Sequence, residues 1–261
     1  MQLLEQADPS TFRDVRLILT DMDETLTYRG RLAATTYAAL EALQTSVLKV
    51  IPVTAAPAGW CDQMARMWPV DGVIGENGGF FFRRSNQGHF VERHYWHGDA
   101  DRAAVAERLT QIGEVVRRAV PSASFADDQP FRQTSIAFAK PARLEDRTLI
   151  LGTLRGAGAH VTENNLWLLG WIGGYDKLAM TRRVLFDHFD IDVDRDPGAV
   201  LYVGDSANDA PMFSFFRHTV GVSTVVDCLD QIPQPPRWIT SGPGGAGFVE
   251  AAKAAIASRK P

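Results

Sequence analysis

Short apolar runs alternate with amphipathic stretches in the first third of the chain. Residues 15–20 form one such run, which stops at Asp21, and residues 47–53 form another, which stops before Thr54. Short continuous apolar runs with polar ends are typical of parallel strands that are buried on both faces. Apolar residues spaced along one face predict a helix over 33–43 between them. A further helix over 58–67 and a strand over 72–75 complete the predicted elements of this part.

The last third of the chain repeats this alternation. It predicts strands over 199–203, 219–222 and 238–240, and helices over 177–189, over 209–216 and from about residue 248. Alternating strands and helices predict an α/β fold in which helices cover both faces of a Rossmann-like, doubly wound parallel sheet.

The middle of the chain has a different pattern. Strands are predicted over 80–84, 89–96, 135–140 and 160–172, and helices over 100–120 and 143–155. This order predicts an inserted α+β domain over 82–170, which splits the core into residues 1–81 and 171–261. Glycine pairs at 78–79 and 173–174 bracket the insert. Such pairs can serve as hinges or simply as tight turns, and the sequence leaves both interpretations open.

Composition narrows the class of protein. The 261 residues include 27 Lys and Arg against 31 Asp and Glu, a net charge of −4, and 45% are apolar. These values exclude a disordered or fibrous chain, and the acidic balance argues against nucleic acid as a partner. The chain lacks the roughly 20 consecutive apolar residues of a membrane span, and its first residues do not resemble a signal peptide. Two distant cysteines, Cys61 and Cys228, favour a reducing cytoplasm. The oligomeric state cannot be read from the sequence.

Carboxylates gather where the predicted core strands end. Asp21 and Asp23 follow the first strand, and Asp205 and Asp209 follow the strand over 199–203. The carboxyl ends of parallel strands meet at one edge of the sheet, and like charges that close together repel. A hard divalent cation with oxygen ligands would relieve that repulsion, and Mg²⁺ suits a site that takes phosphate. Lys177, at the start of a predicted helix, is a second candidate positive charge.

Four segments together resemble the motifs of the haloacid dehalogenase-like (HAD) phosphohydrolase superfamily. They are Asp21-Met22-Asp23-Glu24-Thr25, Thr54, Lys177, and the run from Gly204 to Asp209. The insert between the second and third motifs looks like the large α/β cap of class IIB. That class includes Cof-type, sucrose-phosphate, trehalose-phosphate and mannosyl-3-phosphoglycerate phosphatases, and also phosphomannomutases. The resemblance implies a Mg²⁺-dependent phosphomonoester hydrolase whose substrate is a small phosphorylated metabolite, such as a sugar phosphate.

The resemblance also implies a role for each matching residue. Asp21 would be the nucleophile that carries an aspartyl-phosphate, and Asp23 would protonate the leaving alcohol and then activate water. Thr54 and Lys177 would hold phosphoryl oxygens. The metal would be held by Asp21, by the carbonyl of Asp23 and by Asp205. Asp209 would either bind the metal through water or orient Lys177.

Candidates for substrate binding lie in the motifs and in the insert. Backbone N–H groups near Met22 and Ala55 would hold phosphate, with Asn208 close by. Leaving-group candidates are Arg83, Arg132, Asn164 and Asn165. Relatives with this cap often carry Gly-Arg after the second-motif Thr. This chain has Ala55-Ala56 instead, so a substrate contact from that arginine is absent.

Two other functions remain open at this stage. A phosphomutase would use the same residues but return the phosphoryl group to a sugar. A non-enzymatic binding module on the same fold is the second alternative, although it would have no need of the nucleophile.

Overall fold

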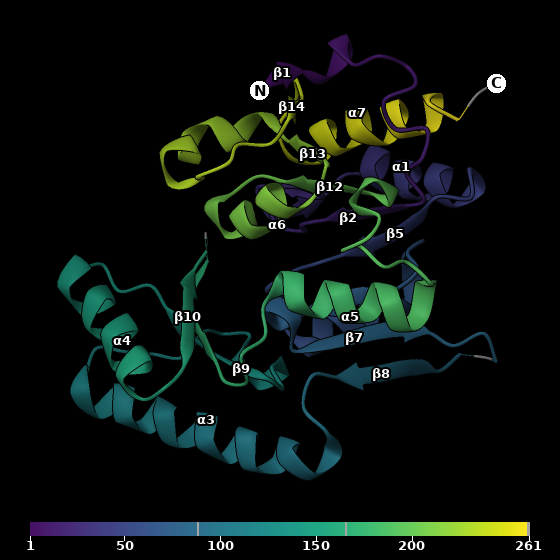
Figure 1. Ribbon diagram of the computed structural model, residues 1–261. Coiled ribbons are helices and arrows are strands. Elements are labelled where there is room, and N and C mark those ends of the chain that lie inside the picture. Colours follow the sequence, from purple (N-terminus) through teal and green to yellow (C-terminus); the bar gives the residue numbers. More distant parts are fainter. Residues whose placement is uncertain (88, 165, 260–261) are drawn as a thin grey trace.

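The core of the protein is a six-stranded, wholly parallel sheet (Figure 1). The computed structural model describes residues 1–87, 89–164 and 166–259. The sheet order is β1 (Gln2–Leu3), β14 (Trp238–Ile239), β13 (His218–Gly221), β12 (Val200–Gly204), β2 (Leu17–Thr20) and β5 (Lys49–Pro52). The predicted α/β fold with a doubly wound parallel sheet is therefore confirmed, and β1 is an edge strand that the sequence pattern did not indicate.

Two hydrophobic clusters, one on each face of the sheet, hold the helices in place. Alternate residues of β2 face opposite sides, so Ile18 packs in one cluster while Leu17 and Leu19 pack in the other. This two-sided burial explains why the strand is a continuous apolar run. Each such side chain contributes about 1.5–3 kcal/mol relative to leaving it exposed.

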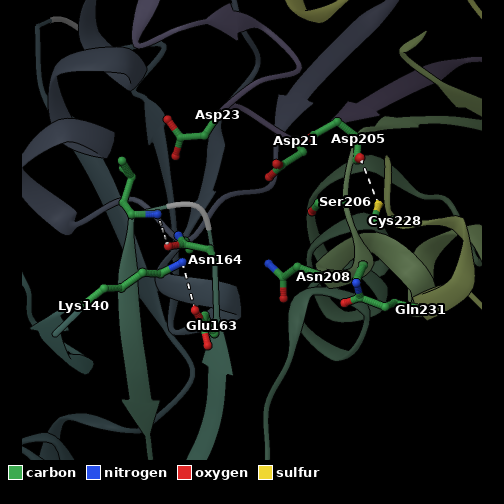
Figure 2. Close-up of a pocket in the computed structure, with 13 residues that line it drawn as sticks. Asp21, Asp23, Lys140, Glu163, Asn164, Asp205, Ser206, Asn208, Cys228 and Gln231 are labelled. Atoms are coloured by element: carbon green, nitrogen blue, oxygen red, sulfur yellow. Dashed lines mark hydrogen bonds and ion pairs between the residues drawn. The ribbon is translucent and has the colours of Figure 1, made fainter. Parts of the chain in front are cut away.

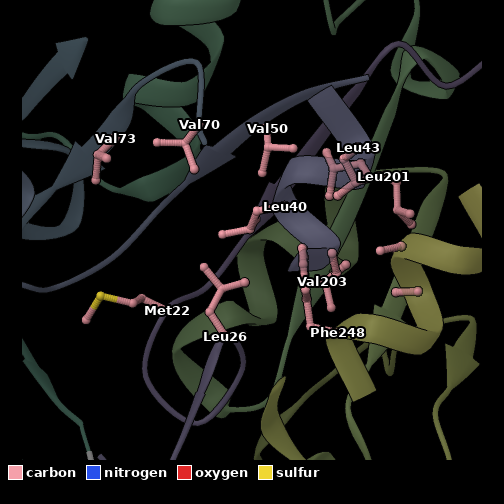
Figure 3. Packing of buried hydrophobic residues seen from close by; sticks show 14 of the residues in the cluster. Met22, Leu26, Leu40, Leu43, Val50, Val70, Val73, Leu201, Val203 and Phe248 are labelled. Carbon is pink, nitrogen blue, oxygen red and sulfur yellow. The ribbon is translucent and has the colours of Figure 1, made fainter. Parts of the chain in front are cut away.

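The first cluster lies under α1 (Ala34–Thr45) and α7 (Gly244–Ala257). Figure 3 shows Leu40 and Leu43 of α1 beside Val50 and Leu201 of the sheet, with Phe248 entering from α7. The second cluster lies under α5 (Lys177–Phe189) and α6 (Ala210–Phe215). A 3₁₀ turn over Ala207–Asp209 precedes α6, and α7 begins four residues before the predicted start.

A three-stranded antiparallel sheet extends the core beyond β5. It contains β6 (Val73–Gly75), β7 (Phe80–Arg84) and β8 (Val91–Tyr95), and a parallel bridge from Val53 to Ile74 joins it to the end of β5. Phe80 and Phe82 belong to the first core cluster and Phe81 to the second. The β7–β8 hairpin, which the sequence pattern assigned to the insert, thus packs with the core.

The remaining part of the insert forms a separate layer with its own hydrophobic cluster, drawn from residues 105–172. Helices α3 (Asp99–Ala119) and α4 (Leu144–Gly156) cover one face of a sheet ordered β10 (His160–Glu163), β11 (Trp167–Trp171) and β9 (Ser135–Ala139). The prediction of one strand over 160–172 is wrong, because the chain reverses between β10 and β11. From this packing we propose that the boundaries of the insert lie near residues 97 and 173.

The two crossings between core and insert lie side by side. Nε1 of Trp96 donates to the carbonyl of Gly173 at 2.8 Å, and a ring nitrogen of His97 lies 2.9 Å from the carbonyl of Ile172. The pair Gly78-Gly79, in contrast, is packed tightly, since a Cβ on Gly79 would lie 1.9 Å from Oγ1 of Thr134. That close approach favours the tight-turn interpretation for the first pair, and a hinge at 173–174 stays a prediction.

Further elements are a β-ribbon of β3 (Thr27–Tyr28) and β4 (Arg31–Leu32), α2 (Ala58–Met67), which precedes β6, and several 3₁₀ helices, of which Ser223–Gln231 is the longest. Among the described residues, no helix is both long and apolar enough to cross a membrane.

Candidate active site

Of the four carboxylates predicted to meet at the carboxyl edge of the core sheet, Asp21, Asp205 and Asp209 form one cluster, and Asp23 lies outside it. Asp21 follows β2 and Asp205 follows β12, and these two strands are neighbours in the sheet. The N–H of Asp21 donates to the carbonyl of Val203 at 2.9 Å, which continues the strand pairing up to the site. One oxygen from each of Asp21, Asp205 and Asp209 lies within 4.8 Å of the others, and all three residues are buried.

Lys177 places its ammonium group between two of these carboxylates. Its Nζ lies 2.8 Å from Oδ1 of Asp21 and 2.9 Å from Oδ1 of Asp209. Lys177 is the first residue of α5, and Asp176 caps that helix by accepting from the N–H of Ala179 at 2.6 Å. The cap therefore sets where the lysine leaves the backbone.

Asp209 is fully buried, and both of its side-chain oxygens have donors. Besides Lys177, Oδ1 accepts from the hydroxyl of Tyr202, and Oδ2 accepts from the N–H groups of Asp205 and Ser206 at 3.0 and 3.1 Å. Of the two roles left open for Asp209, these contacts favour orientation of Lys177 and of the loop that carries Asp205.

The electrostatics show how crowded the acidic groups are. Burial raises the pKa of Asp21 to about 7, with Lys177 opposing the shift and Asp209 adding to it. Burial, followed by the charge of Asp21, raises the pKa of Asp205 to about 9. Burial alone would raise the pKa of Asp209, but the ammonium of Lys177, together with the hydrogen bonds from Tyr202 and Ser206, outweighs burial and lowers that pKa. The single lysine thus compensates Asp209 and leaves Asp21 and Asp205 in need of another positive charge.

The donor set fits a hard divalent cation such as Mg²⁺. Asp21 and Asp205 offer carboxylate oxygens at the edge of a pocket, and the hydroxyl of Thr25 donates to Oδ1 of Asp205 at 2.8 Å, which orients that carboxylate. All candidate ligands are oxygen atoms, which Mg²⁺ prefers. These residues could hold the ion, and its charge would offset the repulsion between them.

The loop over Thr54–Ala56 forms a second wall of the site. Oγ1 of Thr54 accepts from the N–H of Ala56 at 3.0 Å, and the carbonyls of Thr54 and Ala56 accept from the N–H groups of Asn77 and Glu76. Ala55 lines the pocket. Backbone hydrogen bonds to residues 76 and 77 thus fix the position of this loop beside the pocket.

The pocket lies between the core and the insert and has a volume of about 340 Å³. Figure 2 shows Asp21, Asp23 and Asp205 above it, while Lys140, Glu163 and Asn164 enter from the insert. Ser206, Asn208, Cys228 and Gln231 line the remaining side. Asp23 is partly exposed, and the burial of its carboxyl group raises its pKa to about 6.

Some of the residues predicted to contact substrate line the pocket, and other described ones do not. Ala55, Asn208 and Asn164 line the pocket, and Oδ1 of Asn208 accepts from the hydroxyl of Thr162 in the insert at 3.4 Å. Met22 is buried beside Asp21, and its carbonyl accepts from the N–H groups of the turn after it. Asn165 lies outside the described residues.

Two predicted arginines have other partners. The guanidinium of Arg132 forms a bidentate, buried pair with Asp128 at 2.9 and 2.7 Å, and also donates to the carbonyl of Ala55 at 3.0 Å. Arg83 pairs with Glu92 at 2.6 Å on the β7–β8 hairpin, away from the pocket. Arg132 therefore supports the Thr54–Ala56 loop from behind, and Arg83 stabilises the hairpin.

Sequence reasoning missed several residues of the site. Lys140 and Glu163, which form an ion pair at 3.0 Å in the pocket, stand at the ends of β9 and β10. Tyr202 looks like an ordinary strand residue. Only the predicted strand ends of the insert could have drawn attention to the charged pair, by the same logic that found Asp21.

Comparison with known proteins supports the fold. No protein-family model matches the sequence, and no curated protein matches it at the threshold applied. Solved structures match over nearly their whole length. Protein 0175 of Thermoplasma acidophilum is 18% identical, with 93% of this chain and 99% of that chain covered and a TM-score of 0.72. A haloacid dehalogenase-like hydrolase from Bacteroides thetaiotaomicron is 14% identical, with 92% and 98% covered and a TM-score of 0.64.

A third match is the sucrose-phosphatase of Synechocystis sp. PCC6803 in complex with sucrose and phosphate. It is 13% identical, with 91% of this chain and 96% of that chain covered and a TM-score of 0.64. The chain therefore has the fold of the haloacid dehalogenase-like hydrolases, including the inserted layer.

Proposed function

We propose that this protein is a Mg²⁺-dependent phosphomonoester hydrolase that acts through an aspartyl-phosphate on Asp21. The observation that carries the proposal is the buried cluster of Asp21, Asp205 and Asp209 with Lys177 at one side and a pocket at the other. Phosphoryl transfer depends mainly on positioning and on stabilising negative charge. The cluster supplies both a carboxylate nucleophile and fixed positive charge.

The first step would transfer the phosphoryl group to the protein. A carboxylate oxygen of Asp21 attacks phosphorus, the bond from phosphorus to the leaving oxygen breaks, and Asp23 in its acid form protonates that oxygen. Asp23 lines the same pocket as Asp21, within reach of a group bound there. Lys177 and the Thr54–Ala56 loop hold the phosphoryl oxygens, and Asp209 keeps Lys177 in position.

The second step would return Asp21 to its starting state. Asp23, now a carboxylate, takes a proton from water as the water oxygen attacks phosphorus, and Asp21 leaves as a carboxylate. When bound by Asp21, the Asp23 carbonyl and Asp205, Mg²⁺ would supply charge that neutralises the phosphoryl oxygens.

The chemistry of the pocket supports an uncharged, hydroxylated leaving group. Besides Asp21, Asp23 and Asp205, the charged groups among the described residues that line it are Lys140 and Glu163, and these two form an ion pair. Asn164, Asn208, Ser206 and Gln231 supply neutral donors and acceptors. A sugar phosphate fits such a lining better than a substrate with a second anion, and the match to a sucrose-phosphatase points the same way.

The state of the two cysteines supports a location in the cytoplasm. Cys61 and Cys228 carry free thiols, which is usual in a reducing compartment.

The test is turnover of an aryl phosphate and of a panel of sugar phosphates by the purified protein with Mg²⁺. Asp21→Asn should lower kcat by at least about a thousandfold, and EDTA should abolish activity until Mg²⁺ is restored. Retained activity in Asp21→Asn contradicts the mechanism. Transfer of phosphate to a second sugar without release of inorganic phosphate would identify a mutase, and no activity in wild-type protein would favour a binding module.

A further inference from the structure

Glu76 lies where the insert touches the core, outside the residues that face the pocket. It follows β6, is fully buried, and has a positive φ of 46°, as does its neighbour Asn77 with 58°. Left-handed backbone in non-glycine residues costs about 1–3 kcal/mol and persists only where surrounding contacts require it. The contacts of the Glu76 side chain show why this backbone conformation is needed.

The carboxylate of Glu76 accepts five hydrogen bonds. Oε1 accepts from the N–H groups of Ala58 and Gln133 at 3.0 and 2.9 Å. Oε2 accepts from the N–H and hydroxyl of Thr134 at 2.8 and 2.9 Å and from the hydroxyl of Ser135 at 2.7 Å. Four of the five donors thus come from residues 133–135, the segment of the insert that leads into β9.

The backbone of Glu76 and of Asn77 holds the loop that would bind phosphate. The N–H of Glu76 donates to the carbonyl of Ala56 at 3.1 Å, and the N–H of Asn77 donates to the carbonyl of Thr54 at 3.0 Å. The bond to Ala58 satisfies an N–H in the first turn of α2, directly after the loop. One residue therefore contacts both the insert and the Thr54–Ala56 loop.

The insert also reaches this loop directly, which reinforces the connection. Arg132 donates to the carbonyl of Ala55, and Ala137 and Leu169, on the open face of the insert sheet, pack against the Ala55 side chain. From the docked segment, β9 runs to Lys140 in the pocket. The position of residues 133–135 therefore determines where Lys140 stands.

We propose that Glu76 is a positioning residue that docks the insert onto the core and sets the placement of the insert side of the pocket relative to the Thr54–Ala56 loop. The proposal rests on the proposed function for its kinetic consequence, but its structural consequence is independent of catalysis. With the docking weakened, the Arg132 contact to Ala55 and the crossings near residues 97 and 173 remain, and Gly173 and Gly174 at the second crossing both have positive φ.

The test uses Glu76→Gln in the full-length protein. Glutamine has nearly the same shape, but one carboxylate oxygen becomes an amide that donates. Because each oxygen of Glu76 faces at least one backbone N–H, either orientation of the amide opposes a donor to a donor. Glu250→Gln is the matched control, since Glu250 of α7 accepts from the N–H groups of Ser241 and Gly242, in the loop that precedes this helix, far from the insert.

The first measurement is hydrogen–deuterium exchange, which needs no activity. Glu76→Gln should raise exchange in residues 133–139 and 54–60 at least fivefold, while α1 and α7 stay as in the wild type. In the Glu250→Gln protein, exchange should change only near Ser241 and Gly242, and residues 133–139 and 54–60 should stay as in the wild type. Unchanged exchange in 133–139 in a folded Glu76→Gln protein overturns the proposal, whatever the outcome of the phosphatase assay.

The second measurement separates positioning from a general structural role. The ratio of kcat/KM for the best sugar phosphate to that for acetyl phosphate, whose leaving group is too small to reach the insert, should fall at least fivefold in Glu76→Gln. Equal loss for both substrates would contradict the positioning role. If Glu76→Gln does not fold, Thr134→Val with Ser135→Ala removes the two hydroxyl donors to Glu76, together with the acceptor that the Ser135 hydroxyl offers to Arg132 at 3.2 Å, and should give the same effects in smaller measure. A double variant that matches the wild type in both measurements overturns the proposal.

Discussion

Oδ1 of Asp209 lies 2.9 Å from Nζ of Lys177, and neither group is exposed to solvent. The acid therefore holds the lysine from behind while the lysine contacts Asp21 in front. In the proposed mechanism, Asp209 would therefore act through the side chain of Lys177, in contrast to Asp205, which lines the pocket.

Replacing Asp209 should separate these two roles. In Asp209→Asn the charge that holds Lys177 is lost, so we expect kcat to fall by roughly a hundredfold, with a much smaller change in the Mg²⁺ concentration that gives half-maximal activity. Asp205→Asn, the comparison variant, should instead weaken Mg²⁺ activation strongly. Titration of phosphate release with Mg²⁺ in both variants checks this, and equal loss of Mg²⁺ response would place Asp209 among the ligands.

The metal should also stabilise the folded protein. Asp21 and Asp205 repel one another where they converge, and a bound cation relieves that repulsion. A ligand at 100 times its Kd stabilises the native state by about 2.7 kcal/mol, so saturating Mg²⁺ should raise Tm by several degrees. Differential scanning fluorimetry measures the shift, and Asp205→Asn should abolish it. A wild-type Tm that is insensitive to Mg²⁺ would contradict the assignment of the site.

The sequence was most informative where the chain follows a simple period. Strands buried on both faces produce continuous apolar runs, and the first polar residue after each run lies at the edge of the sheet. That is why Asp21 and Asp205 could be brought together before the fold was known. Lys177 was a candidate because it stands at the start of a predicted helix and lies in the sequence between the two pairs of carboxylates.

Elsewhere the structure depends on tertiary contacts that produce no periodic pattern in the sequence. Arg132 looks like a surface arginine until the fold brings Asp128 and the Ala55 carbonyl to it. The run over 160–172 is apolar enough to suggest one strand, although Asn164 accepts from the N–H groups of Leu166 and Trp167 and helps reverse the chain. The β7–β8 hairpin was assigned to the insert because sequence order does not show which cluster its phenylalanines join.

The buried pair of Arg132 and Asp128 predicts an asymmetric effect on stability. Arg132→Met leaves Asp128 buried without its partner, which should cost about 3–5 kcal/mol of unfolding free energy. Arg132→Met combined with Asp128→Leu should recover part of the loss, since no lone charge remains. Arg117→Met, which breaks the exposed pair with Glu114, should change stability by less than about 1 kcal/mol. Urea unfolding gives all three values, and a single variant no worse than the double would contradict the prediction.

A pair of histidines predicts how stability responds to acid. The rings of His94 and His188 lie 4.4 Å apart, and partial burial, together with Arg83 and, at His188, the charge of His94, lowers the pKa of both below 6.5. Since the folded-state pKa lies below the unfolded value, the contribution to stability is full above pH 6.5 and is lost as the pH falls. The other charged groups that act on the pair are Glu92, Arg183 and Asp187.

The measurement is the fall in Tm between pH 7.5 and pH 5.5. His188→Gln removes one titrating ring and the repulsion between the two, so the fall should be smaller in that variant than in the wild type. Exposed His89→Gln is the control and should behave as the wild type does. An equal fall in all three proteins would show that the pair does not govern the response.

Glu163 should determine how strongly the pocket prefers neutral leaving groups over negatively charged ones. Its carboxylate lies 3.0 Å from Nζ of Lys140 and 3.9 Å from Arg147, so it offsets two cations at the rim of the pocket. Glu163→Gln leaves those charges uncompensated. We therefore expect kcat/KM for a substrate with a second phosphate or a carboxylate to rise about tenfold relative to a neutral sugar phosphate.

The assay compares one neutral and one doubly anionic substrate at two salt concentrations. Because the gain is electrostatic and close to solvent, it should shrink as ionic strength rises. Glu145→Gln is the control, since Glu145 is an exposed residue of α4 whose side chain pairs with Arg143 and does not line the pocket. An unchanged preference in Glu163→Gln would show that the ion pair does not select among leaving groups. Retained activity toward an aryl phosphate would show that the catalytic cluster is intact, so that the lack of effect belongs to the charge at the rim.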